Sequence, residues 1–198
     1  MSDPECATVL VVDDERDVAD AYAAQLEDRY DVITAYSGEE ALEALDPTVD
    51  AVLLDRRMPD VSGDEVLETI RDRNLETRVA MVTAVDPDFD IIEMPFDDYV
   101  VKPVVRDDLH ETIDRMLRCA EYEKHVREYY ALTAKYAALK ASKAQPELEG
   151  NEEFEDLQAE IESRRRSLDE AVARFDDRDF DAVFRDFSTD RQAAIDWE

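Results

Sequence analysis

Short apolar runs alternate with amphipathic stretches over residues 1–120. The runs are rich in β-branched residues and bounded by polar ones, which is typical of parallel strands buried on both faces. They cover residues 7–12, 32–35, 51–54, 79–83 and 99–101. The stretches that follow them have helical spacing and predict helices over about 15–29, 37–45, 63–73, 88–94 and 105–119. Five strand–helix units predict an α/β domain with a five-stranded, doubly wound parallel sheet.

After about residue 120 the strand pattern stops and two long helical stretches follow. The first, 122–143, contains no Gly or Pro and continues the direction of the predicted helix before it. Pro146 and Gly150 interrupt the chain. The second stretch, 152–175, has an apolar heptad seam that is broken by Arg164 and includes Phe154, Ile161, Leu168 and Phe175. We therefore expect an all-α domain over 121–198, built on a coiled-coil-like antiparallel hairpin over 122–175, with a last amphipathic piece over 180–187.

The charge of the chain indicates the environment in which the protein works. It has 53 acidic and 23 basic residues, a net charge of −30 at pH 7, and this self-repulsion should be relieved by salt. An acid-rich, lysine-poor composition resembles that of proteins from salt-loving archaea. No apolar run has the roughly 18 residues of a membrane helix, and the acidic first residues do not form a secretory signal. Cys6 and Cys119 form no metal or redox motif. We expect a cytoplasmic protein with no membrane partner.

Polar side chains follow four of the predicted strands. Asp13 and Asp14 come after the first strand and Asp55 after the third, whereas Thr83 ends the fourth and Lys102 follows the fifth. Each feature alone is commonplace in turns, helix caps and strand ends. Together they lie at one edge of the sheet, because the carboxyl ends of parallel strands share that edge. Ligands of open α/β sheets bind beyond these strand ends. The combination predicts a functional site there.

The groups at this edge suit phosphoryl transfer to the protein itself. Three crowded carboxylates repel one another unless a hard cation lies among them, and Mg²⁺ prefers such oxygen ligands. With the metal present, one carboxylate can attack phosphorus and become an acyl phosphate. An ammonium and a hydroxyl group would hold the phosphoryl oxygens. The chain has only three glycines and no phosphate-cradling loop, which argues against a nucleotide site.

The motifs around these residues resemble those of a known family. In order and approximate spacing, residues 11–15 (Val-Val-Asp-Asp-Glu), 53–59 (Leu-Leu-Asp-Arg-Arg-Met-Pro), 81–84 (Met-Val-Thr-Ala) and 99–103 (Tyr-Val-Val-Lys-Pro) are similar to the receiver domain of two-component response regulators. The resemblance covers roughly residues 6–120 and implies a flavodoxin-like receiver fold. It also implies phosphorylation by a histidine kinase and no enzymatic activity beyond self-phosphorylation and autodephosphorylation.

The resemblance assigns roles to individual residues. It implies that Asp55 is the phosphoacceptor. Mg²⁺ would be bound by Asp14, Asp55 and the backbone carbonyl of Arg57, and by Asp13 through water. A phosphatase of the haloacid dehalogenase type also uses an Asp nucleophile at a strand end. That family needs a second Asp two positions later, where this chain has Arg57.

The remaining roles concern switching. The resemblance implies that Lys102 pairs with the phosphoryl group, that Thr83 moves toward it, and that Tyr99 is an aromatic switch that follows Thr83 inward. Two features depart from the family pattern. The stretch between Thr83 and Lys102 is short and contains two prolines, so its helix must be brief, and two adjacent arginines follow Asp55.

The second half of the chain leaves two interpretations open. Residues 128–139 and 177–186 resemble the HalX domain of haloarchaeal regulators, which favours transcriptional control. The first helix is locally basic, which suits a DNA or transcription-machinery partner. The alternative is a protein-binding output that regulates a kinase or another signalling partner, because the net charge is negative and molar salt weakens phosphate contacts. The heptad seam also makes a homodimer plausible.

Overall fold

The computed structural model describes residues 6–175 and 179. The chain divides into two compact units, Met1–Leu117 and Arg118–Glu198. The amphipathic piece predicted over 180–187 lies outside the described residues. Among the helices that are described, none is long and apolar enough to span a membrane.

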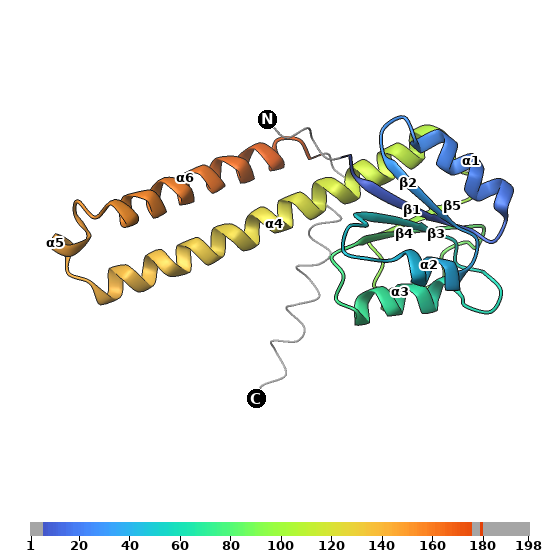
Figure 1. Cartoon of the computed structure of the whole chain (residues 1–198), viewed down its shortest axis with the longest axis horizontal. Helices are drawn as coiled ribbons and strands as arrows, with labels where there is room; N and C mark the ends of the chain where they lie inside the picture. The colour runs from blue at the N-terminus through green and yellow to red at the C-terminus, as the bar shows by residue number, and fades with distance from the viewer. Residues whose placement is uncertain (1–5, 176–178, 180–198) are drawn as a thin grey trace. The chain divides into compact units, whose positions relative to one another are not determined.

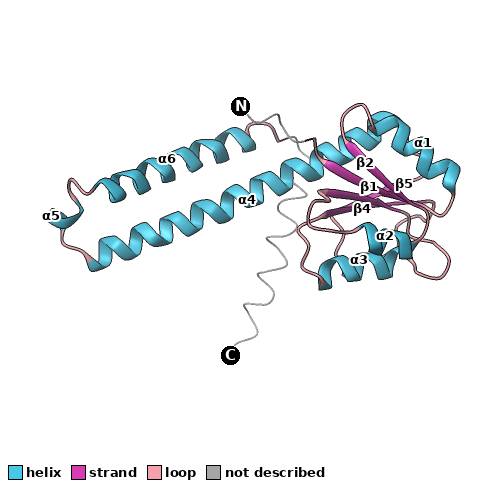
Figure 2. Ribbon diagram, in the orientation of Figure 1, coloured by secondary structure: helices cyan, strands magenta, loops and turns pink. Residues whose placement is uncertain are grey.

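The N-terminal unit contains a five-stranded parallel sheet (Figure 2). Its strand order is β2-β1-β3-β4-β5. The strands are β1 Thr8–Val12, β2 Asp31–Ala35, β3 Ala51–Leu54, β4 Arg78–Thr83 and β5 Asp98–Val101. The connecting helices are α1 Arg16–Leu26, α2 Gly38–Ala44, α3 Gly63–Asp72 and the short 3-10 helix η1 Phe89–Glu93. The predicted doubly wound α/β fold is confirmed, and the brief helix expected before β5 is a 3-10 turn.

Helices cover both faces of this sheet (Figure 1). On one face, Val9, Val11 and Leu53 pack with α1 and with the first turns of α4. On the other face, Leu10 and Val52 pack with α2 and α3. All four residues of β3 are buried, as expected for a central parallel strand. Each fully buried Val or Leu contributes about 1.5–3 kcal/mol, so the two clusters stabilise the strands that carry the polar residues.

Strand register brings the polar residues to one edge. Val12 of β1 is the partner of Leu54 of β3, so Asp13 and Asp55 each directly follow one residue of this pair. Thr83 of β4 is the partner of Val101 of β5, directly before Lys102. The backbone N–H of Lys102 donates to the Thr83 carbonyl at 2.8 Å, which extends the pairing by one residue.

The C-terminal unit is a helical hairpin. Helix α4, Arg106–Ser142, is continuous from the first unit into the second, and α5, Gln145–Leu148, and α6, Glu152–Val172, follow. Tyr136 of α4 stacks on Phe154 of α6 with ring centroids 5.3 Å apart. The helical hairpin of the predicted fold class is confirmed. The predicted break lies where it was expected, but it contains the short helix α5.

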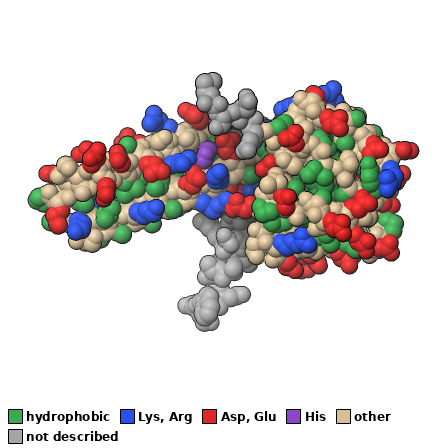
Figure 3. All heavy atoms as spheres, in the orientation of Figure 1, with side chains coloured by type: hydrophobic (Ala, Val, Ile, Leu, Met, Phe, Trp, Pro, Cys, Tyr) green, Lys and Arg blue, Asp and Glu red, His purple; other side chains and the backbone are tan. Residues whose placement is uncertain are grey.

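An ion pair explains the polar interruption of the heptad seam. Arg164 of α6 lies 3.1 Å from the carboxylate of Glu128 of α4, and both side chains are about one-third exposed (36% and 34%). The arginine therefore takes a seam position with its charge satisfied across the hairpin. Acidic side chains are spread over the visible face of the molecule, in keeping with the net charge of −30 (Figure 3).

Candidate functional site

Lys102 links the two buried carboxylates at the carboxyl edge of the sheet. Its Nζ lies 2.6 Å from Oδ2 of Asp13 and 2.9 Å from Oδ1 of Asp55. The side chains are 16%, 3% and 8% exposed for Lys102, Asp13 and Asp55 respectively. The sequence predicted that these three groups meet, and the structure brings them together. Asp14, by contrast, is exposed.

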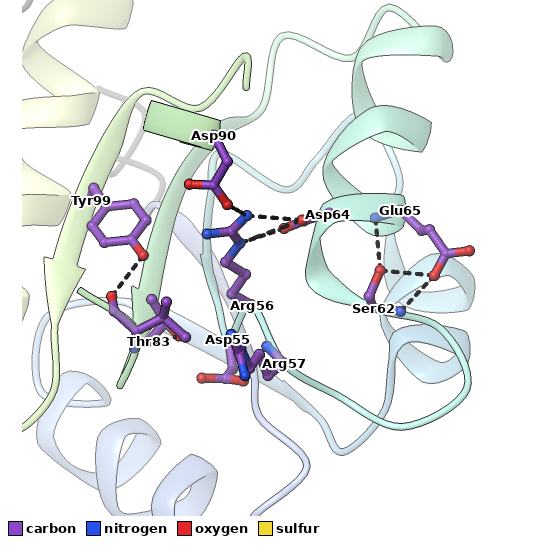
Figure 4. Close-up of polar contacts among 10 residues, drawn as sticks. Asp55, Arg56, Arg57, Ser62, Asp64, Glu65, Thr83, Asp90 and Tyr99 are labelled. Carbon is purple, nitrogen blue, oxygen red and sulfur yellow. Dashed lines mark hydrogen bonds and ion pairs between the residues drawn. The ribbon is translucent and has the colours of Figure 1, made fainter. Parts of the chain in front are cut away.

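The loop after β3 holds the Asp55 carboxylate in place. The backbone N–H of Arg57 donates to Oδ2 of Asp55 at 2.8 Å. Gly63 closes the loop, since its N–H donates to the Arg56 carbonyl at 3.0 Å. A Cβ at Gly63 would lie only 2.2 Å from the Asp55 carbonyl oxygen, so this close approach requires glycine. Helix α3 then begins with a reciprocal cap between Ser62 and Glu65 (Figure 4).

The electrostatics of the site leave negative charge uncompensated. Burial raises the pKa of Asp55 above its ordinary value, even though the hydrogen bond from Lys102 acts in the opposite direction. Burial also opposes the charge of Lys102, but its hydrogen bonds to Asp13 and Asp55 prevail and raise its pKa. One ammonium therefore serves two carboxylates, and the three groups carry a net charge of −1 when all are ionised.

The donor set fits a hard divalent cation in kind. Carboxylate oxygens of Asp13, Asp14 and Asp55 and the Arg57 carbonyl are the ligands that Mg²⁺ prefers. A divalent ion would also compensate the surplus negative charge. Within residues 6–175 and 179, no three His, Cys, Asp or Glu side chains are already arranged around one point. Lys102 instead lies between Asp13 and Asp55, so a metal would bind beside the ammonium or displace it.

Thr83 and Tyr99 both bind the backbone of one residue, Val85. The buried Thr83 hydroxyl accepts a hydrogen bond from the Val85 N–H at 3.3 Å. The Tyr99 hydroxyl donates to the Val85 carbonyl at 2.8 Å (Figure 4). The ring of Tyr99 also lies 5.5 Å from that of Phe96, centroid to centroid. A displacement of the Thr83 hydroxyl would therefore release a residue that Tyr99 also holds.

Sequence reasoning missed the role of Arg56. The sequence showed two adjacent arginines after Asp55 as a departure from the family pattern, without assigning partners to their side chains. Arg57 is exposed, whereas the Arg56 side chain is only 12% exposed and pairs with Asp64 and Asp90. The two partners lie 8 and 34 residues away in sequence, so no local spacing rule would have found them.

The family of the chain follows from two domain matches. The response regulator receiver domain matches residues 9–114, more than half of the chain, and the HalX domain matches residues 118–184. The chain is a response regulator. Its receiver domain has the flavodoxin-like fold that the sequence resemblance predicted, and a HalX domain follows it. Response regulators are typically signalling proteins rather than enzymes.

Two proteins similar to this response regulator carry the names of transcriptional regulators. A candidate transcriptional regulator from Haloferax volcanii is 52% identical over 165 residues, which cover 83% of this chain and 28% of that protein. The alkaline phosphatase synthesis transcriptional regulatory protein PhoP of Bacillus subtilis is 36% identical over 118 residues, covering 57% of this chain and 49% of that protein. The chain therefore spans between about a quarter and a half of the length of these relatives.

A solved receiver-domain structure has the same fold, at a sequence identity close to that of PhoP. The BeF3-activated DrrB receiver domain superposes with a TM-score of 0.52 at 30% identity. The match covers 56% of this chain and 97% of that domain. The match to a protein of Haloferax volcanii also agrees with the resemblance to proteins of salt-loving archaea that the acid-rich composition indicated.

Proposed function

We propose that this response regulator accepts a phosphoryl group on Asp55 with Mg²⁺ bound, and that the modified receiver switches its HalX domain to regulate transcription. The observation that carries the proposal is Lys102 joining the buried carboxylates of Asp13 and Asp55 at the carboxyl edge of the sheet. The donor would be a cognate histidine kinase, which is the usual partner of receiver domains.

The chemistry assigned to Asp55 is a simple displacement. A carboxylate oxygen of Asp55 forms a bond to phosphorus while the bond from phosphorus to the donor atom breaks, and the donor leaves with the bonding electron pair. When bound, Mg²⁺ would be held by Asp14, Asp55 and the Arg57 carbonyl, with Asp13 acting through water, and would neutralise the carboxylates and phosphoryl oxygens. Lys102 supplies a positive charge to one phosphoryl oxygen, and Arg57 N–H keeps the acceptor carboxylate oriented.

Switching is assigned to Thr83 and Tyr99. A hydroxyl that moves to a phosphoryl oxygen must give up the hydrogen bond that it now accepts from Val85. The Tyr99 hydroxyl, bonded to the Val85 carbonyl, then loses its fixed partner. The two states differ in these contacts, so phosphorylation biases the equilibrium between them. Helix α4 begins directly after this region, at Arg106, and supplies the covalent route to the HalX domain.

The transcriptional part of the proposal is supported by the charge of α4. Between residues 124 and 143 the only acidic residue is Glu128, and it pairs with Arg164 of the hairpin. The five basic residues of this stretch are exposed: Lys124, Arg127, Lys135, Lys140 and Lys143. Cations along one helix suit a DNA backbone or an acidic partner. A protein-binding output is the second candidate, because a net charge of −30 disfavours binding to a polyanion.

The phosphorylation step is tested with a small phosphodonor. The full chain in molar KCl and MgCl₂ is incubated with acetyl phosphate, and the intact mass and the modified peptide are determined. We expect one phosphoryl group on Asp55, none in Asp55→Asn, and normal labelling in Asp60→Asn, a matched change on the same loop. Label on Asp55→Asn would place the acceptor elsewhere.

The output is tested in the native host. Chromatin immunoprecipitation of the tagged wild type and of Asp55→Asn should show enrichment at a defined set of promoters that weakens in the variant. No enrichment in either form would favour the protein-binding output, and co-purification would then identify the partner.

A further inference from the structure

Arg56 follows the phosphoacceptor directly but faces two other elements. Its Nε lies 3.1 Å from Oδ1 of Asp64, in the first turn of α3. Its Nη2 lies 2.5 Å from Oδ2 of Asp90, in η1. Figure 4 shows the guanidinium between these carboxylates, with Tyr99 beside Asp90. Arg56 thus joins the phosphoacceptor loop, α3 and η1 through one side chain.

Helix η1 has few other attachments. None of its residues is buried, and Phe89 and Ile92 are 85% and 75% exposed. Within the described part of the chain, the contact with Arg56 is the hydrogen-bonded ion pair that joins η1 to another element. The flanks of η1 are held separately, by the Tyr99 hydroxyl at Val85 and by packing of Met94 against the core. The position of η1 therefore depends on Arg56.

The ion pair between Arg56 and Asp90 can break without a large energetic cost. Hydrogen bonds to Asp64 and Asp90 raise the pKa of the Arg56 guanidinium, so it stays charged at any relevant pH. Asp90 is 54% exposed, however, so water can replace the guanidinium at its carboxylate. Asp64 provides a second acceptor at the same fork, so Arg56 keeps one partner when it loses the other. Breaking the Asp90 contact then leaves no buried charge unpaired.

There is also room for a displacement. An open cavity of about 500 Å³ lies between the loop after β3 and the segment that leads into η1. Its lining includes Arg56, Asp64, Val85 and Asp90. Val85 is the residue held by both Thr83 and Tyr99. Val85 and Asp90 of η1 thus line the same cavity, and a displacement of either residue would change its shape.

We infer that Arg56 is a positioning residue that holds η1 in the unphosphorylated state, and that the Thr83 and Tyr99 displacement on phosphorylation breaks the Arg56–Asp90 contact and frees η1. This inference rests on the proposed function of Asp55. It gives the unusual arginine after the phosphoacceptor a purpose in regulation. It also makes the exposure and mobility of Phe89 and Ile92 dependent on the state of the site.

Hydrogen–deuterium exchange of the full chain in molar KCl tests the link. Wild type, Arg56→Met, Asp90→Asn and Asp64→Asn are compared without additives and with Mg²⁺ plus beryllium fluoride, a phosphoryl mimic. In wild type, exchange of the amides of residues 88–94 should rise about five-fold on adding the mimic, as expected for loss of one partly exposed ion pair. In Arg56→Met and Asp90→Asn it should already be raised without the mimic and change little with it. Asp64→Asn should behave as wild type.

Two results would overturn the inference. One is unchanged exchange of residues 88–94 in Asp90→Asn. This result is sufficient by itself if Arg56→Met does not fold. The other is a full additional response of either variant to the mimic. A merely structural role of Arg56 would instead raise exchange in β1 and α1 as well, which Asp90→Asn should leave at wild-type values. Failure of the proposed function is distinguished by acetyl phosphate labelling: wild type that is not labelled at Asp55 contradicts the proposal itself.

Discussion

Replacing Lys102 by Met is the sharpest test of the electrostatics of the site. Methionine keeps most of the length of the side chain but removes the ammonium that lies 2.6 Å from Asp13 and 2.9 Å from Asp55. Both carboxylates are almost fully buried, at 3% and 8% side-chain exposure. The variant therefore leaves two buried, adjacent anions without their shared cation.

The expected cost follows from this burial. Removing one partner of a buried ion pair costs about 3–5 kcal/mol, because the remaining charge is buried and unpaired. Here protonation of the Asp55 carboxyl, whose pKa burial already raises, limits the loss. We expect a loss of about 3 kcal/mol at pH 7, or a melting temperature lower by about 6–12 °C for a chain of this size. The raised pKa of Lys102 means that its contribution is complete at pH 7 and is lost only as the pH rises above its ordinary value toward the raised one.

The assay is urea and thermal unfolding in molar KCl with a chelator, then with added Mg²⁺. Salt screens buried pairs little, so the loss should persist in molar KCl. Mg²⁺ should recover more stability in Lys102→Met than in wild type, because the metal would take the place of the lost cation. In an Asp55→Asn background the same change should cost about 1–2 kcal/mol less. A loss below about 0.5 kcal/mol, or an equal loss in both backgrounds, would refute the reasoning.

Three further tests compare variants whose behaviour follows from the structure. Because the folded pKa of Asp55 is raised by burial, wild type loses stability relative to Asp55→Asn as the pH rises from the ordinary value through the raised one; parallel pH profiles of unfolding free energy would contradict this. Gly63→Ala, with its Cβ 2.2 Å from the Asp55 carbonyl oxygen, should cost about 2 kcal/mol and slow labelling by acetyl phosphate; an unchanged melting temperature and labelling rate would count against it. In the hairpin, Phe154→Ala should cost about 3 kcal/mol, whereas Arg164→Leu should change stability by less than about 1 kcal/mol because its pair with Glu128 is one-third exposed; thermal unfolding showing the reverse order would be inconsistent with the packing.

The strands were predictable because their physics is local. A parallel strand buried on both faces must be a nearly continuous apolar run, and β3 begins and ends where its run does, at Ala51 and Leu54. The meeting of Asp13, Asp55 and Lys102 followed from the same argument, since the carboxyl ends of parallel strands share one edge. These parts of the fold and site depend on patterns that a single sequence displays.

Features set by long-range pairing were not predictable. Arg164 breaks the heptad seam of α6, and its partner Glu128 lies in another helix. Arg56 was visible as one of two unusual arginines, but its direction is fixed by Asp64 and Asp90, which the fold alone brings near. A spacing rule finds partners one helical turn away, whereas these partners come from other elements of the fold.

The two partly buried cations near the phosphoacceptor have similar surroundings. Lys102 lies between Asp13 and Asp55, and Arg56 lies between Asp64 and Asp90, so each cation serves two carboxylates. A cation shared by two anions can shift toward either of them when the charge nearby changes. A phosphoryl group adds a charge of about −1.5 to −2 at this edge, which is enough to change the preferred partner of Lys102. In a chain with a net charge of −30, a shortage of cations relative to carboxylates would therefore make the proposed switch sensitive to one added phosphoryl group.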